Sequence, residues 1–209
     1  MSKPVIWITG ASSGIGEACA HAFGREGAKV VITGRNQSKL DLSSKQLKDH
    51  GIDVLPILAD AASEVDNQRM AEETLSKFGR IDILINNAGI SMRALFQDLD
   101  IEVFKKVMDI NFWGAVYATK YCLDSITKQK GSIIGISSIN GYRGTPARTA
   151  YTASKFAMNG FFESLRTEVM NQGVHVMVAA PGFTASNIRN NALTAHGEVQ
   201  GASPRDEGK

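Results

Sequence analysis

Cysteine is scarce in this chain, and its scarcity excludes two classes of protein. The 209 residues contain two cysteines, Cys19 and Cys122. Two thiols cannot build a disulfide framework or a cysteine metal cluster, and both lie in apolar helical patterns. We therefore interpret them as buried thiols in a reducing compartment. The four histidines show no ligand spacing, so no metal site is expected.

Excess charge and long apolar runs are also missing. A net charge of +2 gives no reason to expect nucleic acid or an anionic membrane as a partner. No apolar run approaches the ~20 residues of a membrane helix, and the N-terminus has no signal-peptide pattern. With 43% hydrophobic and 21% charged residues, the composition is that of a soluble globular protein. We expect one cytoplasmic domain with a substantial core.

What the chain does contain is a regular alternation of short apolar runs and amphipathic segments. The runs predict strands at 5–9, 29–33, 54–58, 81–85, 132–137 and 174–179. Helices are predicted up to about 25, and at 38–48, 63–78, 102–127 and 149 to before 173. This order predicts an α/β fold, a parallel sheet with helices on both faces, which binds ligands at the carboxyl ends of its strands. We assign 1–189 to this domain and 190–209, which loses periodicity, to a mobile tail or the start of a substrate-lid region.

A glycine-rich turn separates the first predicted strand from the first helix. Glycines let the backbone approach a phosphate closely, and the helix N-terminus beyond attracts negative charge. The spacing is G-x-x-x-G-x-G rather than the usual G-x-G-x-x-G. We predict a dinucleotide site here, with a plain connection as the alternative. Its candidate ligands are Gly10, Ser12, Ser13, Gly14, Ile15 and Gly16.

The end of the second strand indicates which dinucleotide binds. NAD-binding proteins usually place an acidic side chain at this point, whereas NADP-binding proteins often place an arginine there. This chain has Arg35, a planar and permanently charged fork suited to a phosphate, and no carboxylate at that point. We predict NADP(H) as the preferred cofactor and NAD(H) as the alternative. The alternative is an exposed arginine that makes no specific contact, which would give the same sequence pattern.

Tyr151 and Lys155 stand four positions apart on a predicted helix and so share one face. A free phenol titrates near ~10, too high for efficient acid–base work at neutral pH. An ammonium beside the phenol would stabilise the phenolate and lower that pKa. Such pairs are common on solvated helices, so the spacing alone is weak.

Taken together, these motifs resemble the classical short-chain dehydrogenase/reductase family. The matching residues span 5 to about 188 and keep the family's order and spacing. They are the turn at 9–16, Asn86-Asn87-Ala88-Gly89, Asn111, Ser138, Tyr151, Lys155 and Pro181-Gly182. The resemblance implies a Rossmann-type doubly wound fold and an NAD(P)-dependent oxidoreductase acting on a carbonyl or alcohol.

The resemblance also implies roles for single residues. Tyr151 would be the general acid in reduction and the base in oxidation, and Ser138 would hold the substrate oxygen. Lys155 would bind the nicotinamide ribose and lower the tyrosine pKa, and Asn111 would anchor a relay water. The remaining cofactor contacts would come from Asp60 and Ala61, from Asn87, Ala88 and Gly89, and from Pro181, Gly182, Thr184 and Ser186.

Several alternatives stay open at this point. Ser137 is a neighbouring hydroxyl, although the spacing to Tyr151 favours Ser138. The chain could be a catalytically silent dinucleotide-binding or regulatory protein of the same fold, or could catalyse epimerisation or dehydration. Family members usually continue past the sixth strand, which leaves open whether Lys209 is the natural end.

The substrate itself is not specified beyond a small carbonyl or alcohol. Its pocket is predicted near Ser91, Met92, Arg93, Ile139, Tyr142, Arg143, Phe183 and Ile188. Apolar residues on more than one face of the long helices, around 112–121 and 156–162, favour a homodimer or homotetramer.

Overall fold

The computed structural model describes residues 3–182, 184 and 186–201. Within these ranges the chain forms a six-stranded sheet in the order β3-β2-β1-β4-β5-β6, and every pairing in it is parallel. The strands are β1 Val5–Ile8, β2 Lys29–Gly34, β3 Val54–Leu58, β4 Ile83–Asn86, β5 Ser132–Ile136 and β6 His175–Ala179. The predicted α/β doubly wound fold is confirmed.

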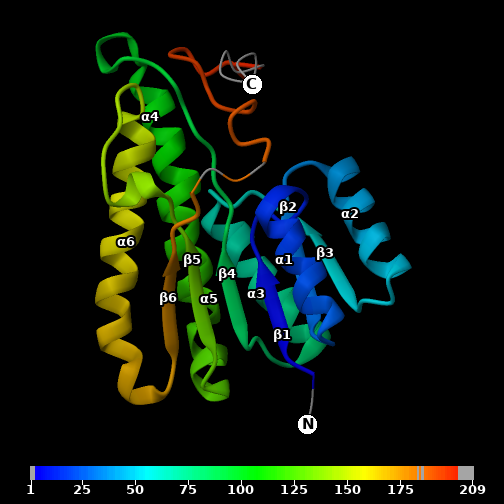
Figure 1. Cartoon of the computed structure of the whole chain (residues 1–209). Helices are drawn as coiled ribbons and strands as arrows, with labels where there is room; N and C mark the ends of the chain where they lie inside the picture. Colours follow the sequence, from blue (N-terminus) through cyan, green and yellow to red (C-terminus); the bar gives the residue numbers. More distant parts are fainter. Residues whose placement is uncertain (1–2, 183, 185, 202–209) are drawn as a thin grey trace.

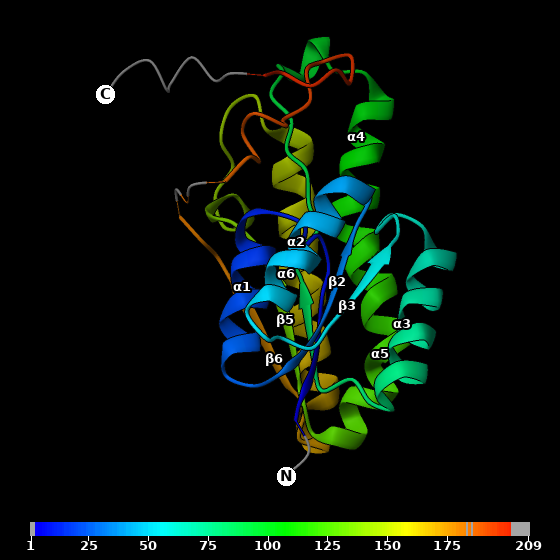
Figure 2. The same ribbon diagram turned by 90° about the vertical axis from the view of Figure 1, so that its right-hand side faces the viewer.

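Helices cover both faces of this sheet (Figure 1; Figure 2). They are α1 Gly14–Arg25, α2 Gln37–Asp49, α3 Glu64–Phe78, α4 Ile101–Met108, α5 Gly114–Gln129 and α6 Thr149–Val169. Short turns complete the set: η1 Phe96–Asp98, η2 Asp109–Trp113, η3 Ile139–Gly141 and η4 Met170–Gln172. One apolar cluster joins the sheet to α3, α5 and α6, and a second joins it to α1 and α2.

The strands β1, β2 and β4 are apolar at almost every position because both of their faces are buried. Trp7 and Val31 belong to the cluster under α3, α5 and α6, whereas Ile6, Ile8 and Ile32 belong to the cluster under α1 and α2. Successive strand side chains point to opposite faces, so a strand with two covered faces needs apolar residues throughout.

The long helix predicted over 102–127 is interrupted. The structure runs from α4 through a π turn, Asp109–Trp113, directly into α5. A π turn fits one extra residue into a helix without ending it, so hydrophobic periodicity still reads as one helix. The turn contains Asn111, whose side chain is fully buried.

Strand β1 is the point at which the direction of sheet winding reverses. It pairs with β2 on one side and β4 on the other, so the chain builds outward to β3 and then crosses back. The loops after β1 and β4 therefore diverge at the carboxyl edge and leave a crevice.

Residues 187–201 lie at this same edge of the sheet. Leu193 forms isolated bridges to Met92 and to Val199, and the carbonyl of Ala195 accepts a hydrogen bond of 3.0 Å from the backbone N–H of Asp100. Part of the segment that the sequence assigns to a tail or lid region thus packs against the loop before α4.

None of the described helices is long and apolar enough to cross a membrane.

Candidate active site

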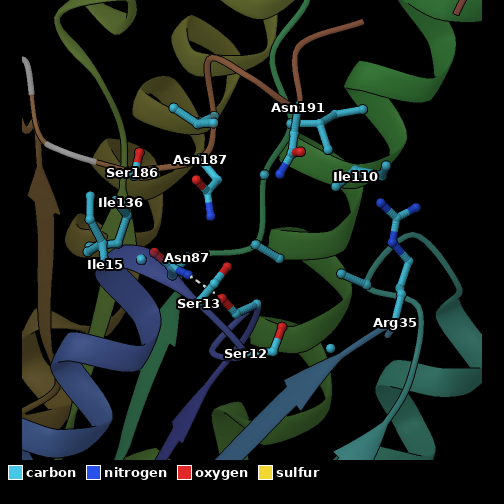
Figure 3. Close-up of a pocket in the computed structure, with 18 of the residues that line it drawn as sticks. Ser12, Ser13, Ile15, Arg35, Asn87, Ile110, Ile136, Ser186, Asn187 and Asn191 are labelled. Atoms are coloured by element: carbon cyan, nitrogen blue, oxygen red, sulfur yellow. Dashed lines mark hydrogen bonds between the residues drawn. The ribbon is translucent and has the colours of Figure 1, made fainter. Parts of the chain in front are cut away.

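A cavity of 540 Å³ lies at the carboxyl edge of the sheet (Figure 3). Its wall comes from the turns that follow β1, β2, β3, β4 and β6, from the residues after β5, and from the first turns of α6. Nearly all of the predicted site residues line it: Gly10, Ser12, Ser13, Gly14, Ile15, Arg35, Asp60, Ala61, Asn87, Ala88, Gly89, Ser138, Tyr151, Lys155, Pro181, Gly182, Thr184 and Ser186. Gly16 and Asn111 are the exceptions, and both stand behind the wall.

The glycine turn after β1 is held by hydrogen bonds from the segment after β4. Asn87 Nδ2 donates to the carbonyls of Thr9 and Gly10 at 2.9 and 3.0 Å. Gly10 has a φ of +64°, and a Cβ there would lie 2.8 Å from Ala88 Cα. A side chain at Gly10 would therefore be strained and would push the two turns apart.

Gly16 serves packing rather than lining. A Cβ at this position would lie 2.5 Å from Asn87 Nδ2 and 2.8 Å from the Gly10 carbonyl oxygen. Gly16 is predicted to contact a cofactor, but it does not line the cavity. The first turn of α1 directs Gly16 inward, beneath the glycine turn. Its absent side chain lets α1 begin close enough to offer its N-terminus to the cavity.

The residues around this turn fit a dinucleotide. The Ser13 side chain does not cap α1, so the helix N-terminus keeps backbone N–H groups available for an anion. Arg35 lies at the far end of the cavity, with Nη1 4.0 Å from Asp60 Oδ2, and both side chains are largely exposed. Positive charge thus marks the end of β2, where the sequence places the 2′-phosphate.

Lys39 is a further cation on this wall, and it was not among the predicted site residues. Asn36 caps α2 by accepting a hydrogen bond of 2.9 Å from the backbone N–H of Lys39. This cap places Lys39 in the first turn of α2, and Lys39 lines the same cavity as Arg35. An Asn three residues before a lysine could have signalled the arrangement.

Tyr151, Ser138 and Lys155 meet on one side of the cavity. The Ser138 hydroxyl and the Tyr151 phenol both line the cavity here, and Lys155 Nζ lies 5.8 Å from the centre of the Tyr151 ring. Burial raises the pKa of Tyr151, while the neighbouring Ser138 hydroxyl and the charge of Arg148 act in the opposite direction.

That Lys155 lowers this pKa stays a prediction. Lys155 is only 3% exposed, and its ammonium donates a hydrogen bond of 2.8 Å to the Ile136 carbonyl. Burial lowers the pKa of Lys155 to about 8. The Lys155 ammonium therefore points toward the end of β5. The net shift of the Tyr151 pKa is upward.

Asn111 links two walls of the site from behind. Its Oδ1 accepts from the Ile90 backbone N–H at 2.8 Å, and its Nδ2 donates to the Ile90 carbonyl and to Ser154 Oγ at 2.9 Å each. Ser154 Oγ in turn donates to the Tyr151 carbonyl at 2.8 Å. The side chain therefore fixes the loop after β4 to α6, and its role as a water anchor stays a prediction.

Arg148 is a further residue that the sequence analysis missed. Its Nη1 donates to Ser91 Oγ and to the Met92 carbonyl at 2.5 and 2.9 Å. It joins the segment after β4 to the start of α6 and places a positive charge near Tyr151. No local pattern reveals this, because its partners lie more than fifty residues away in the sequence.

The predicted substrate wall is reproduced only in part. Ile188 lines the cavity, whereas Ser91 and Met92 are buried and do not reach it. Ile139 and Tyr142 are 49% and 62% exposed and lie outside the lining. Phe183 lies outside the described residues. Asn187 and Asn191 were not predicted, and both side chains point into the cavity (Figure 3).

Within the ranges that the structure covers, no three histidine, cysteine, aspartate or glutamate side chains are grouped so as to hold an ion.

A family comparison agrees with this geometry. Residues 4–196 match the family model described as short chain dehydrogenase. The chain belongs to the short-chain dehydrogenase family. Among curated short-chain dehydrogenases it is 42% identical to dehydrogenase/reductase SDR family member 7B of Rattus norvegicus over 209 residues, which are 97% of this chain and 64% of that protein.

Other relatives extend this picture. The chain is 37% identical to 11-beta-hydroxysteroid dehydrogenase A of Arachis hypogaea, covering 93% of this chain and 56% of that protein. It thus spans less than two thirds of the length of these curated relatives.

Solved short-chain dehydrogenases share the fold closely. A Burkholderia phymatum enzyme in complex with NAD superimposes with a TM-score of 0.87 at 26% identity, covering 90% of this chain and 68% of that one. A variant of actinorhodin polyketide ketoreductase with NADPH gives 0.86 at 28% identity, covering 88% and 72%. One of these two similar structures therefore contains NAD, and the other contains NADPH.

Proposed function

We propose that this protein is an NADP(H)-dependent oxidoreductase that interconverts a carbonyl compound and a secondary alcohol. The observation that carries the proposal is the grouping of Ser138, Tyr151 and Lys155 in the same cavity as the glycine turn. Two hydroxyls that converge from different elements suit one substrate oxygen.

The protein's part in this reaction is to position the substrate and handle one proton. The nicotinamide, when bound, supplies the hydride for reduction or accepts it in oxidation. In reduction, the Ser138 and Tyr151 hydroxyls hydrogen-bond the carbonyl oxygen, and Tyr151 Oη gives that oxygen its proton. Burial keeps the phenol protonated, which favours its role as an acid.

Lys155 and Asn111 support this step from the other side of the tyrosine. The Lys155 ammonium lies beside the Tyr151 ring and would hold the nicotinamide ribose. Asn111 keeps the start of α6 in place through Ser154. The dinucleotide phosphates would lie against the N-terminus of α1, near Ser12 and Ser13.

The preference for NADP is tested together with the activity itself. Purified protein is assayed for loss of the 340 nm absorbance of NADPH or NADH against a panel of ketones and aldehydes, hydroxysteroid-type ketones included. Arg35→Asp replaces the proposed phosphate ligand by a carboxylate suited to a ribose hydroxyl. We expect its KM for NADPH to rise about 10–100-fold, the equivalent of losing a charged hydrogen bond, and its KM for NADH to change little.

Arg25→Asp is the matched control, because Arg25 ends α1, is exposed and does not line the cavity. An unchanged KM for NADPH in Arg35→Asp would refute the assignment of Arg35. Absence of cofactor oxidation with every substrate would refute the reductase proposal and favour a silent dinucleotide-binding protein.

The pH dependence of alcohol oxidation tests the charge near Tyr151. Oxidation needs the phenolate, so its rate rises with pH through the pKa of Tyr151. Arg148→Met removes a cation that lowers this pKa. We therefore expect the pH midpoint of kcat/KM for oxidation to move upward. Arg148→Lys keeps the charge and should keep most of the wild-type profile, whereas a downward or absent shift in Arg148→Met would contradict the assignment.

Substrate and assembly are part of the same proposal. Similarity to hydroxysteroid dehydrogenases supports a secondary alcohol or its ketone as the substrate class. Trp113 and Phe156, which are 43% and 46% exposed at the start of α5 and on α6, support pairing of these helices in a homodimer or homotetramer. The cytoplasmic location stays an expectation from the sequence.

A further inference from the structure

One side chain on α6, Asn159, ties this helix to the segment that carries Ser138. Asn159 follows Lys155 by one helical turn and Tyr151 by two. Ser137 Oγ donates to Asn159 Oδ1 at 2.6 Å, and Asn159 Nδ2 donates to the Gly141 carbonyl at 2.9 Å. Ser137 and Gly141 flank Ser138 and the turn after it. A single amide therefore holds both ends of the segment.

We call this pair of hydrogen bonds the Asn159 tether, and the groups that form it are closely packed. Ser137 is 5% exposed, and Gly141 is buried. A Cβ on Gly141 would lie 2.5 Å from Ser137 Oγ and 2.8 Å from Asn159 Nδ2. The three groups thus approach so closely because residue 141 has no side chain. Asn159 does not line the cavity, so it has no direct contact with a ligand there.

The separation of the two proposed catalytic hydroxyls depends on how α6 sits against β5. Ser138 belongs to the segment after β5, whereas Tyr151 belongs to the first turn of α6. The bond from Lys155 Nζ to the Ile136 carbonyl also joins these elements, but it uses an ammonium that the proposed reaction needs for the cofactor. Asn140 Nδ2 reaches Thr152 Oγ1 at 3.2 Å from a partly exposed position. The amide of Asn159 joins the same elements without using a group that the reaction needs.

We propose that Asn159 is a positioning residue, which sets the distance between the Ser138 hydroxyl and the Tyr151 phenol. This inference rests on the proposed function, because it assumes that both hydroxyls act on one substrate oxygen. Catalytic hydroxyls must hold their places to within roughly 0.5 Å, and a misplacement of about 1 Å can cost ~100-fold in rate.

The test is the variant Asn159→Leu, which keeps the volume but removes both hydrogen bonds. We expect kcat to fall about 10–100-fold while the Kd for NADPH, measured by fluorescence, stays within about twofold. Asn159→Asp keeps the acceptor for Ser137 but sets a carboxylate oxygen against the Gly141 carbonyl, and it should show a similar loss of kcat. Asn171→Leu is the matched control, since Asn171 is exposed in η4 at the opposite end of the sheet.

A second variant separates positioning from misfolding. In Ser137→Ala with Asn159→Leu, no hydroxyl is left without its partner, so the melting temperature should return toward the wild-type value. If the tether acts through position, kcat stays low in this double variant, and Ser137→Ala adds nothing to Asn159→Leu. Recovery of kcat together with the melting temperature would overturn the proposal.

A readout without turnover distinguishes this inference from the proposed function. The Ser138 hydroxyl lowers the pKa of Tyr151, so moving Ser138 away should raise that pKa further. Ultraviolet titration of the phenol, taken as the difference from Tyr151→Phe in each background, measures that shift. An upward shift in Asn159→Leu supports the tether even if no carbonyl substrate is turned over, and an unchanged pKa with an unchanged kcat refutes it.

Discussion

Replacing Tyr151 by phenylalanine should lower kcat about 10²–10⁴-fold while leaving NADPH binding nearly unchanged. The substitution removes the phenolic oxygen and keeps the ring, so the packing of α6 and the shape of the cavity wall are preserved. The proton that the substrate oxygen must gain then has no donor at the right place. Steady-state assays give kcat, and quenching of protein fluorescence by NADPH gives the Kd.

Tyr142→Phe is the control for this experiment. Tyr142 is 62% exposed, lies outside the cavity lining and loses the same oxygen atom. It should retain wild-type turnover. If Tyr151→Phe also kept near wild-type turnover, Tyr151 would not be the proton donor. If Tyr151→Phe instead lost NADPH binding, its effect would be on the shape of the site.

The largest effect on stability is expected at Gly131, where the chain enters β5. A Cβ built on Gly131 would overlap the backbone carbonyl oxygen of Asp82. That oxygen cannot retreat easily, because it accepts a hydrogen bond of 3.0 Å from the Ser132 N–H, and Asp82 Oδ2 accepts one of 2.8 Å from the Val5 N–H. We expect Gly131→Val to lower the free energy of unfolding by at least about 3 kcal/mol.

Urea denaturation followed by circular dichroism measures this loss. Gly160→Ala is a control of opposite sign, because Gly160 lies within α6 and a Cβ there meets nothing within 4 Å. It should stabilise the protein by roughly 0.5–1 kcal/mol. A Gly131→Val variant as stable as the wild type would mean that β5 does not pack against the loop after α3 in the way described.

The sequence predicts this fold well because its signals are local. Each buried strand is a short apolar run, and a glycine turn or a polar residue marks where it ends. The π turn at Asp109–Trp113 escaped prediction because one extra residue per turn leaves the apolar pattern almost unchanged. The sequence does not predict the bridges of Leu193, because a pairing of isolated residues has no repeating pattern.

Local signals also decide which residues of the site the sequence predicts. Residues at the ends of strands could be placed at the cavity from sequence order alone, since parallel strands bring their carboxyl ends to one edge. Arg148 and Asn159 could not, because each acts through partners that only the folded chain brings near. Gly16 has the spacing of a phosphate ligand but is used to let Asn87 approach. The direction of the Tyr151 pKa shift depended on burial, which spacing on a helix does not reveal.

The state of Lys155 has a consequence for the thermodynamics of binding. With a pKa of about 8, the ammonium loses its proton far more readily than an exposed lysine does. A dinucleotide that requires the charged form would bind together with a proton whenever the solution is more alkaline than this value. Affinity for the cofactor would then decline as pH rises above 8, even though the phosphate contacts at the other end of the cavity are unchanged.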